Sequence, residues 1–134
     1  MNKNVFYLRN PEFSFYYNND TIIVLTGNGS VELNPLYVDV VEKCNGENSL
    51  SNITEGIWEK YGINSEDNEA RQLFPKVIEE LLTHKIIEEV SDKAPLSKVN
   101  PITGKKGKLF PSKLVLELTN KCNFSCKHCF KDAK

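Results

Sequence analysis

Three of the four cysteines lie close together near the end of the sequence, in the stretch CNFSCKHC. Cys122, Cys126 and Cys129 follow the spacing C-x3-C-x2-C. The chain lacks a run of about 18 apolar residues and begins without the apolar core of a signal peptide, so we expect a cytoplasmic protein with no membrane partner. Cytoplasmic thiols stay reduced, and such a cluster then favours metal or redox chemistry over a disulfide framework.

Two kinds of metal site fit these thiols. Short spacings let one loop wrap an iron–sulfur cluster, and three thiolates leave one iron of a 4Fe-4S cluster open to a substrate or cofactor. The alternative is a tetrahedral zinc site in which His128 joins the three cysteines. His128 directly precedes Cys129, which strains simultaneous ligation, so we prefer the iron–sulfur interpretation. Cys44 lies in an apolar stripe of helical spacing, and we expect it to be buried rather than a fourth ligand.

The segment before the cysteines predicts how they are positioned. KLVLELT is a nearly continuous apolar run, typical of a strand buried on both faces of a parallel sheet. The cysteines follow directly after it, and α/β barrels place their chemistry in loops at the carboxyl ends of such strands. Residues 113–134 are therefore expected to be the first strand and first loop of an α/β barrel that is incomplete in this chain.

Charge divides the rest of the chain. Residues 1–90 carry seven basic and fifteen acidic side chains, a net charge of −8, whereas residues 91–134 carry ten and three, a net charge of +7. Residues 91–112 form the first half of this basic part and are rich in proline, glycine and lysine. This composition indicates a linker, so we expect a domain over residues 1–90, a linker over 91–112 and the barrel fragment over 113–134.

Three short strands in meander order are predicted near the beginning. FSFYYN (13–18) and TIIVLT (21–26) are β-branched and aromatic runs separated by Asn19 and Asp20, which suit a tight turn. SVELN (30–34) follows a second turn and alternates apolar with polar residues, as a half-buried strand does.

Three helices and a last strand follow. Asn34 and Pro35 are typical of a helix start, and this first helix is expected to end near Gly46. Ser49 or Ser51 begins the second, which Gly62 ends, and the third runs from about 65 to 84 with a kink or break at Pro75. KIIEEV then forms a short wing strand. The predicted fold is α+β, a winged helix-turn-helix-like domain with a three-stranded antiparallel sheet and three helices.

Nucleic-acid binding does not fit the charge of this domain. A winged helix-turn-helix commonly binds DNA through its third helix. Here the domain carries a net charge of −8, and its third helix opens with Glu66, Asp67 and Glu69. These carboxylates would repel phosphates, so we expect a partner other than nucleic acid.

The pattern NPLYVDVVEKCNGENSLSNITEGIWEKYGI, followed by LFPKVIEELLTHKII, resembles the PqqD-like peptide-recognition domains of enzymes that modify ribosomally made peptides. The resemblance covers about residues 5–90. It implies three antiparallel strands packed on three helices, and a partner that is the leader region of a precursor peptide. It also implies that this leader binds in the groove between the third strand and the third helix.

The expected peptide site starts from the edge of the third strand, whose unpaired amides and carbonyls an extended peptide can satisfy. Phe74 and Ile78 are expected to form the floor of the groove, and Arg71 to contact a leader carboxylate at its rim. Helical periodicity fits Phe74 and Ile78 equally well as ordinary core residues. The expected peptide-binding residues are Ser30, Val31, Glu32, Leu33, Asn34, Arg71, Phe74 and Ile78.

LTNKCNFSCKHCF resembles the signature of the radical S-adenosylmethionine superfamily, especially its peptide-maturing members with an auxiliary-cluster extension. The resemblance covers residues 113–134. It implies that Cys122, Cys126 and Cys129 hold a 4Fe-4S cluster whose open iron binds S-adenosylmethionine. It also implies that a radical formed there abstracts hydrogen from the precursor peptide.

Most of such a barrel is missing from this sequence, so we expect the chain to be a fragment of a larger maturase and to be inactive alone. The alternative is a stand-alone winged-helix regulator with a cysteine-rich tail that senses zinc or carries an iron–sulfur cluster. The sequence beyond residue 134 distinguishes the two, because only the maturase needs further barrel strands.

Overall fold

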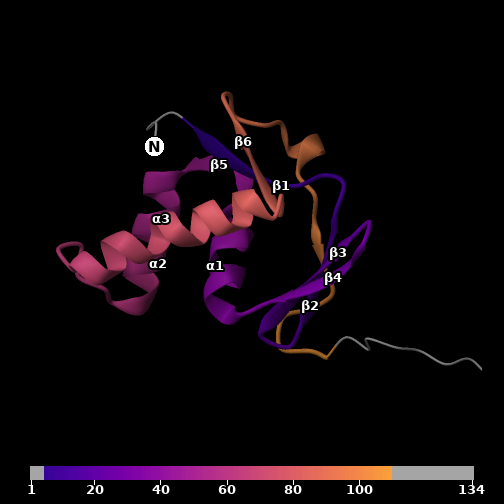
Figure 1. The fold of residues 1–134 in the computed structure, drawn as a ribbon, viewed down its shortest axis with the longest axis horizontal. Coiled ribbons are helices and arrows are strands. Elements are labelled where there is room, and N and C mark those ends of the chain that lie inside the picture. Colours follow the sequence, from indigo (N-terminus) through magenta and orange to yellow (C-terminus); the bar gives the residue numbers. More distant parts are fainter. Residues whose placement is uncertain (1–4, 110–134) are drawn as a thin grey trace, which may run out of the picture.

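The computed structural model describes residues 5–109 and shows an α+β fold with three helices and two sheets (Figure 1). One sheet has the strand order β4-β3-β2-β7 and the other the order β5-β1-β6. Side chains from both sheets and from all three helices meet in a single core. Within residues 5–109 no helix is both long enough and apolar enough to cross a membrane.

The predicted meander is confirmed as β2 (Ser14–Asn18), β3 (Thr21–Thr26) and β4 (Gly29–Leu33), paired antiparallel in that order. Asn19 adopts a positive φ of 57° in the first turn, a conformation that asparagine tolerates better than most residues. Phe15, Ile22 and Val24 are buried and fix the register, because a slip by one residue would turn them to solvent.

Three of the expected helix boundaries are confirmed, at Asn34, Ser49 and Gly62. The first helix ends earlier than expected, at Lys43, and the third begins later, after Asp67 rather than near residue 65. Helix α1 (Pro35–Lys43) starts at Asn34, whose side chain accepts hydrogen bonds from the amides of Leu36 and Tyr37 at 3.1 and 3.3 Å. Helix α2 (Leu50–Tyr61) starts at Ser49 and ends at Gly62, which is left-handed with φ 62°. Helix α3 (Asn68–Thr83) starts at Asp67. Asn34 therefore directly follows β4 and also caps the start of α1.

Of the kink or break expected at Pro75, the break does not occur, because α3 continues through Pro75 as one helix of 16 residues. Proline removes one backbone hydrogen bond and crowds the preceding turn. Phe74 before it and Val77, Ile78 and Leu81 after it are all buried in the core. Burial of apolar side chains on both sides of Pro75 holds the two halves in one helix.

The second sheet contains two strands that the sequence did not predict, β1 (Phe6–Arg9) and β5 (Asn45–Ser49). The expected wing strand is present as β6 (Ile87–Val90), but it pairs with β1 and not with the meander. The segment NGENS lacks β-branched and aromatic residues, so its strand form depends on pairing with β1 rather than on local propensity.

Part of the segment expected to be a linker is packed on the domain. The amide of Ala94 donates to the carbonyl of Gly46 at 3.0 Å, and that of Asn19 donates to the carbonyl of Lys108 at 2.7 Å. Between these points β7 (Ile102–Thr103) pairs parallel with β2. We call residues 94–108 the strap; in Figure 1 it runs in orange along the meander. Its proline and glycine content reflects a tightly turned path rather than a free linker.

Candidate peptide-binding groove

Strand β4 forms one edge of the four-stranded sheet, as the meander order predicted, while the strap covers the other edge. Thr26 and Gly29 flank a two-residue loop and pair with each other. Residues in an antiparallel ladder alternate between those that hydrogen-bond to the neighbouring strand and those that do not. Counted from the Thr26–Gly29 pair beside the loop, every second residue of β4 bonds to β3. The backbone groups of Val31 therefore bond to β3, whereas those of Ser30 and Glu32 point to the open edge.

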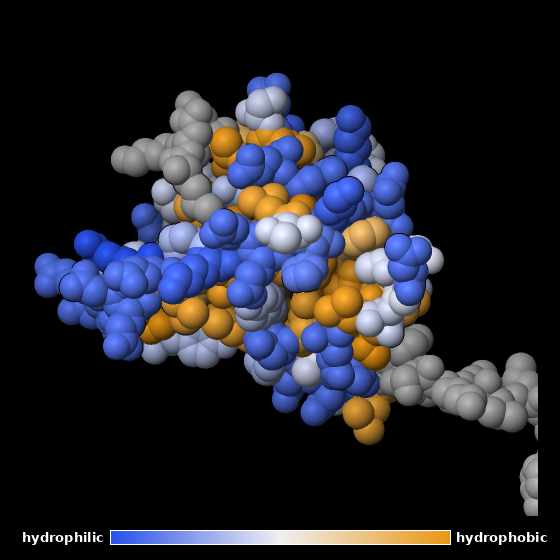
Figure 2. Space-filling view, in the orientation of Figure 1, coloured by the Kyte–Doolittle hydropathy of each residue, from blue (hydrophilic) through white to orange (hydrophobic). Residues whose placement is uncertain are grey.

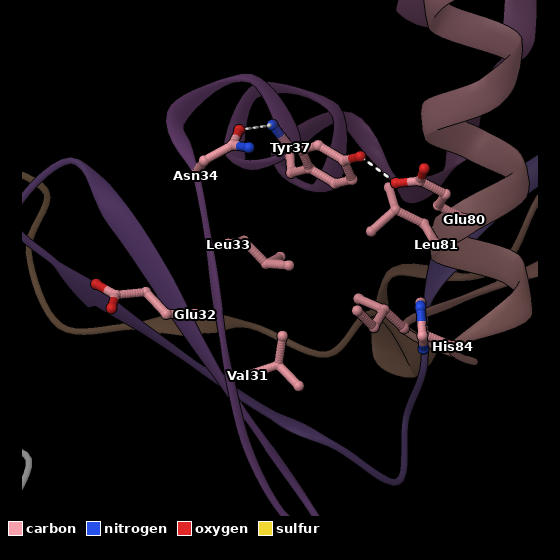
Figure 3. Close-up of a pocket in the computed structure, with 9 residues that line it drawn as sticks. Val31, Glu32, Leu33, Asn34, Tyr37, Glu80, Leu81 and His84 are labelled. Carbon is pink, nitrogen blue, oxygen red and sulfur yellow. Dashed lines mark hydrogen bonds between the residues drawn. The ribbon is translucent and has the colours of Figure 1, made fainter.

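The side chains of β4 alternate between the two faces of the sheet. Figure 3 shows Val31 and Leu33 directed toward α3 and Glu32 directed away from it. Leu33 is buried, but Val31 is 46% exposed. Beside them lies a cavity of about 230 Å³ between β4, the start of α1 and the last turns of α3. We call it the β4 groove.

The β4 groove has an apolar floor and a polar rim. Its lining consists of Val31, Glu32, Leu33, Asn34, Tyr37, Glu80, Leu81, His84 and Ile86. A second hollow of about 330 Å³ shares Val31, His84 and Ile86 with it and extends to the β3–β4 loop. Figure 2 shows apolar surface between α3 and the meander. The two hollows together follow the length of β4.

Tyr37 and Glu80 join the two walls of the groove. The Tyr37 hydroxyl donates a hydrogen bond to Oε2 of Glu80, linking α1 to α3 (Figure 3). This bond, with a smaller contribution from burial, raises the pKa of Tyr37 above its usual value, so the ring stays neutral at physiological pH. The bond fixes the Glu80 carboxylate at the Asn34 end of the groove.

The expected strand residues lie along this groove. Val31, Glu32, Leu33 and Asn34 all line the groove, and Ser30 is exposed on the same open edge. The order of the meander was therefore sufficient to find one wall of the groove, and peptide binding there stays a prediction.

The expected residues of α3 do not line the groove. Phe74 and Ile78 are 2% and 1% exposed and belong to the core, with Phe74 in edge contact with Trp58. Arg71 donates to the carbonyl of Ser65 at 2.7 Å, near the start of the helix. The wall comes instead from the last turns of α3, through Glu80, Leu81 and His84. Continuing the helical spacing from Val77 to Leu81 and His84 would have found them.

The three cysteines Cys122, Cys126 and Cys129 lie outside the described residues. Within residues 5–109 no group of three or more His, Cys, Asp or Glu side chains is arranged to hold a metal ion. Cys44 is fully buried at the end of α1, and burial raises the pKa of its thiol to about 12. Cys44 is therefore a core residue, as its apolar stripe predicted, because metal binding requires a thiolate.

Comparisons with known proteins give limited information. No protein-family model matches the chain, and no curated protein matches it significantly. Among solved structures the chain is similar to the heterocyclase TruD, with 19% sequence identity and a TM-score of 0.49. The similarity covers 69% of this chain and 13% of that one, so the chain spans a small part of TruD. A similarity of this size establishes no shared function.

Proposed function

We propose that residues 5–109 bind the leader region of a ribosomally synthesised precursor peptide by adding it as a strand to β4. The observation that carries this proposal is the open edge of β4 beside an apolar groove. An extended peptide would pair with the backbone groups of Ser30 and Glu32, and its alternate side chains would enter the groove. The main-chain bonds supply affinity and the groove supplies specificity.

The position of Val31 supports this mode of binding. An apolar side chain that is 46% exposed on an open edge is a site for unwanted association unless a partner covers it. The net charge of −8 over residues 1–90 argues against nucleic acid and favours peptides with basic residues, through electrostatic steering.

The chemistry belongs to the second part of the proposal, which rests on the resemblance of residues 113–134. In this proposal Cys122, Cys126 and Cys129 hold a 4Fe-4S cluster that binds S-adenosylmethionine in a cytoplasmic radical maturase. The cluster and S-adenosylmethionine supply radical chemistry on the peptide. Residues 5–109 deliver that peptide.

Amide hydrogen exchange tests the strand addition. The probe is a synthetic leader from a short open reading frame beside the gene of this protein. New protection at Ser30 and Glu32 is expected, because their amides face the open edge. Replacing Ser30 by proline removes one of these amides without breaking a bond to β3, so Ser30→Pro should keep the fold and lose peptide binding. Ser30→Ala is the matched control and should bind as the wild type does.

Three outcomes would count against the proposal. Protection confined to the Asn19 turn or to Ile87–Val90 would place the peptide on another surface. Equal binding by Ser30→Pro and Ser30→Ala would exclude pairing with β4. Binding of duplex DNA by residues 5–109 at physiological salt would favour the winged-helix regulator instead.

A further inference from the structure

The two ends of the β4 groove carry opposite charges. Glu80 lies with Asn34 and Tyr37 at the end where β4 meets α1. Lys85 lines the hollow at the opposite end, beside Asn28 of the β3–β4 loop. Both side chains are exposed and therefore accessible to a ligand.

The Glu80 carboxylate has capacity for a further partner. Among residues 5–109 the ion pairs join Lys60 and Lys106 to Asp39, and Lys106 to Glu42, and none involves Glu80. Its bond from Tyr37 uses one acceptor site of a group that accepts several. A lysine or arginine in a bound peptide would supply the missing cation.

The spacing along the groove matches that of a strand. Four residues of a helix rise about 6 Å, which separates Glu80 from His84 along α3. Alternate side chains of a strand that point to the same face are about 6.8 Å apart. A peptide side chain beside Val31 and His84 would therefore have its next same-face neighbour near Glu80. Lys85 lies on the other side, in the hollow that extends to the β3–β4 loop.

We propose that the β4 groove selects peptides by charge order: a basic residue near Glu80, an apolar residue two positions away beside Val31, and an acidic residue beyond it near Lys85. This inference rests on the proposed function. Antiparallel pairing is the more stable arrangement, and β4 runs from its loop toward Asn34. The antiparallel peptide therefore carries the basic residue first, in the order [KR]-x-Φ followed by an acidic residue, where Φ is an apolar residue.

A displayed library of random peptides, selected on the full chain, tests the charge order. Peptides enriched on the wild type and not on Ser30→Pro depend on the open edge, and these should show the pattern. The double variant E80K/K85E exchanges the two charges at exposed positions, so it should enrich the reverse order, acidic residue first. Resynthesised peptides that differ only in charge order should differ about threefold to tenfold in affinity for the wild type.

The outcomes separate the two proposals. Edge-dependent peptides with an apolar residue but no charge order would overturn this inference and leave the proposed function standing. The reverse order on the wild type would also overturn it. If no peptide is enriched on the wild type over Ser30→Pro, strand addition itself fails and the charge order fails with it. Circular dichroism of E80K/K85E confirms that the exchanged charges leave the fold intact.

Discussion

Arg9 on β1 donates from Nε to the backbone carbonyl of Asn100 in the strap at 2.7 Å. The same guanidinium donates from Nη1 to the carbonyls of Val41 and Glu42 at 3.0 and 3.2 Å. Arg9 is only 6% exposed, and this burial lowers the pKa of its guanidinium from its usual value. One buried cation therefore joins β1, the end of α1 and the strap through main-chain acceptors.

Replacing Arg9 by methionine should destabilise the domain by about 2–4 kcal/mol, because buried carbonyls would lose charged donors. Urea unfolding measures this change. Hydrogen exchange at Ile102 and Thr103 should also accelerate, since Arg9 holds the strap through Asn100. Arg71→Met is the matched control: Arg71 is exposed and donates to the carbonyl of Ser65, so its loss should cost less than about 1 kcal/mol. Equal effects of the two substitutions would contradict this role of Arg9.

The strap should also be required for a monomeric domain. β7 pairs with β2, and Oγ1 of Thr103 donates to the carbonyl of Phe15 at 3.1 Å. A chain that ends at residue 90 loses these partners and exposes β2 as a second open edge, which favours association between copies. Light scattering should detect concentration-dependent oligomers of residues 1–90, whereas residues 1–109 should stay monomeric. Equal masses and equal urea midpoints for the two chains would contradict this prediction.

Local signals in the sequence predicted the elements that local interactions stabilise. Asn34 with Pro35 marked the start of α1, Gly62 marked the end of α2, and the alternation in residues 30–34 marked β4. Each of these signals acts within a few residues, through a side-chain cap, a left-handed conformation or a two-residue period. A sequence shows such signals directly.

Contacts between distant parts of the chain were not predictable in the same way. Phe6 pairs with Ser49 on one side and Val90 on the other, and neither NGENS nor the start of the chain carries a strong strand pattern. The α3 wall of the groove was misplaced for a similar reason. Periodicity shows that Phe74 and Leu81 share the apolar face of a helix, but not which of them meets the edge of a sheet.

Asp39 should make the free energy of unfolding depend on pH in the acid range. Asp39 is 4% exposed, and this burial alone would raise the pKa of its carboxyl. The net shift is nevertheless downward, because Lys60 and Tyr61 donate hydrogen bonds to the carboxylate and the charges of Lys60 and Lys106 stabilise it. With the folded pKa below the unfolded one, this stabilisation is present above about pH 4 and lost as pH falls through the folded value.

Urea unfolding of Asp39→Asn between pH 7 and pH 2.5 measures this contribution. The variant should be less stable than the wild type by about 1–2 kcal/mol at pH 7, and the difference should shrink below about pH 4. Asp92→Asn changes an exposed carboxylate and serves as the control. A difference that stays constant across this range would show that packing, rather than the charge of Asp39, carries the effect.

Substitutions at Phe74 and Val31 should change different quantities, the free energy of unfolding and the affinity for peptide. Phe74 is buried against Trp58 and does not line the groove, whereas Val31 is exposed and does. Phe74→Leu should lower the free energy of unfolding by about 1–2 kcal/mol and leave peptide affinity unchanged, because the altered volume lies inside the core. Val31→Thr keeps the shape and the β-branch, so it should unfold like the wild type but bind peptide several-fold more weakly, since it places a hydroxyl in an apolar contact. Urea unfolding and titration with an edge-dependent peptide measure the two quantities, and weaker binding by folded Phe74→Leu would return Phe74 to the floor of the groove.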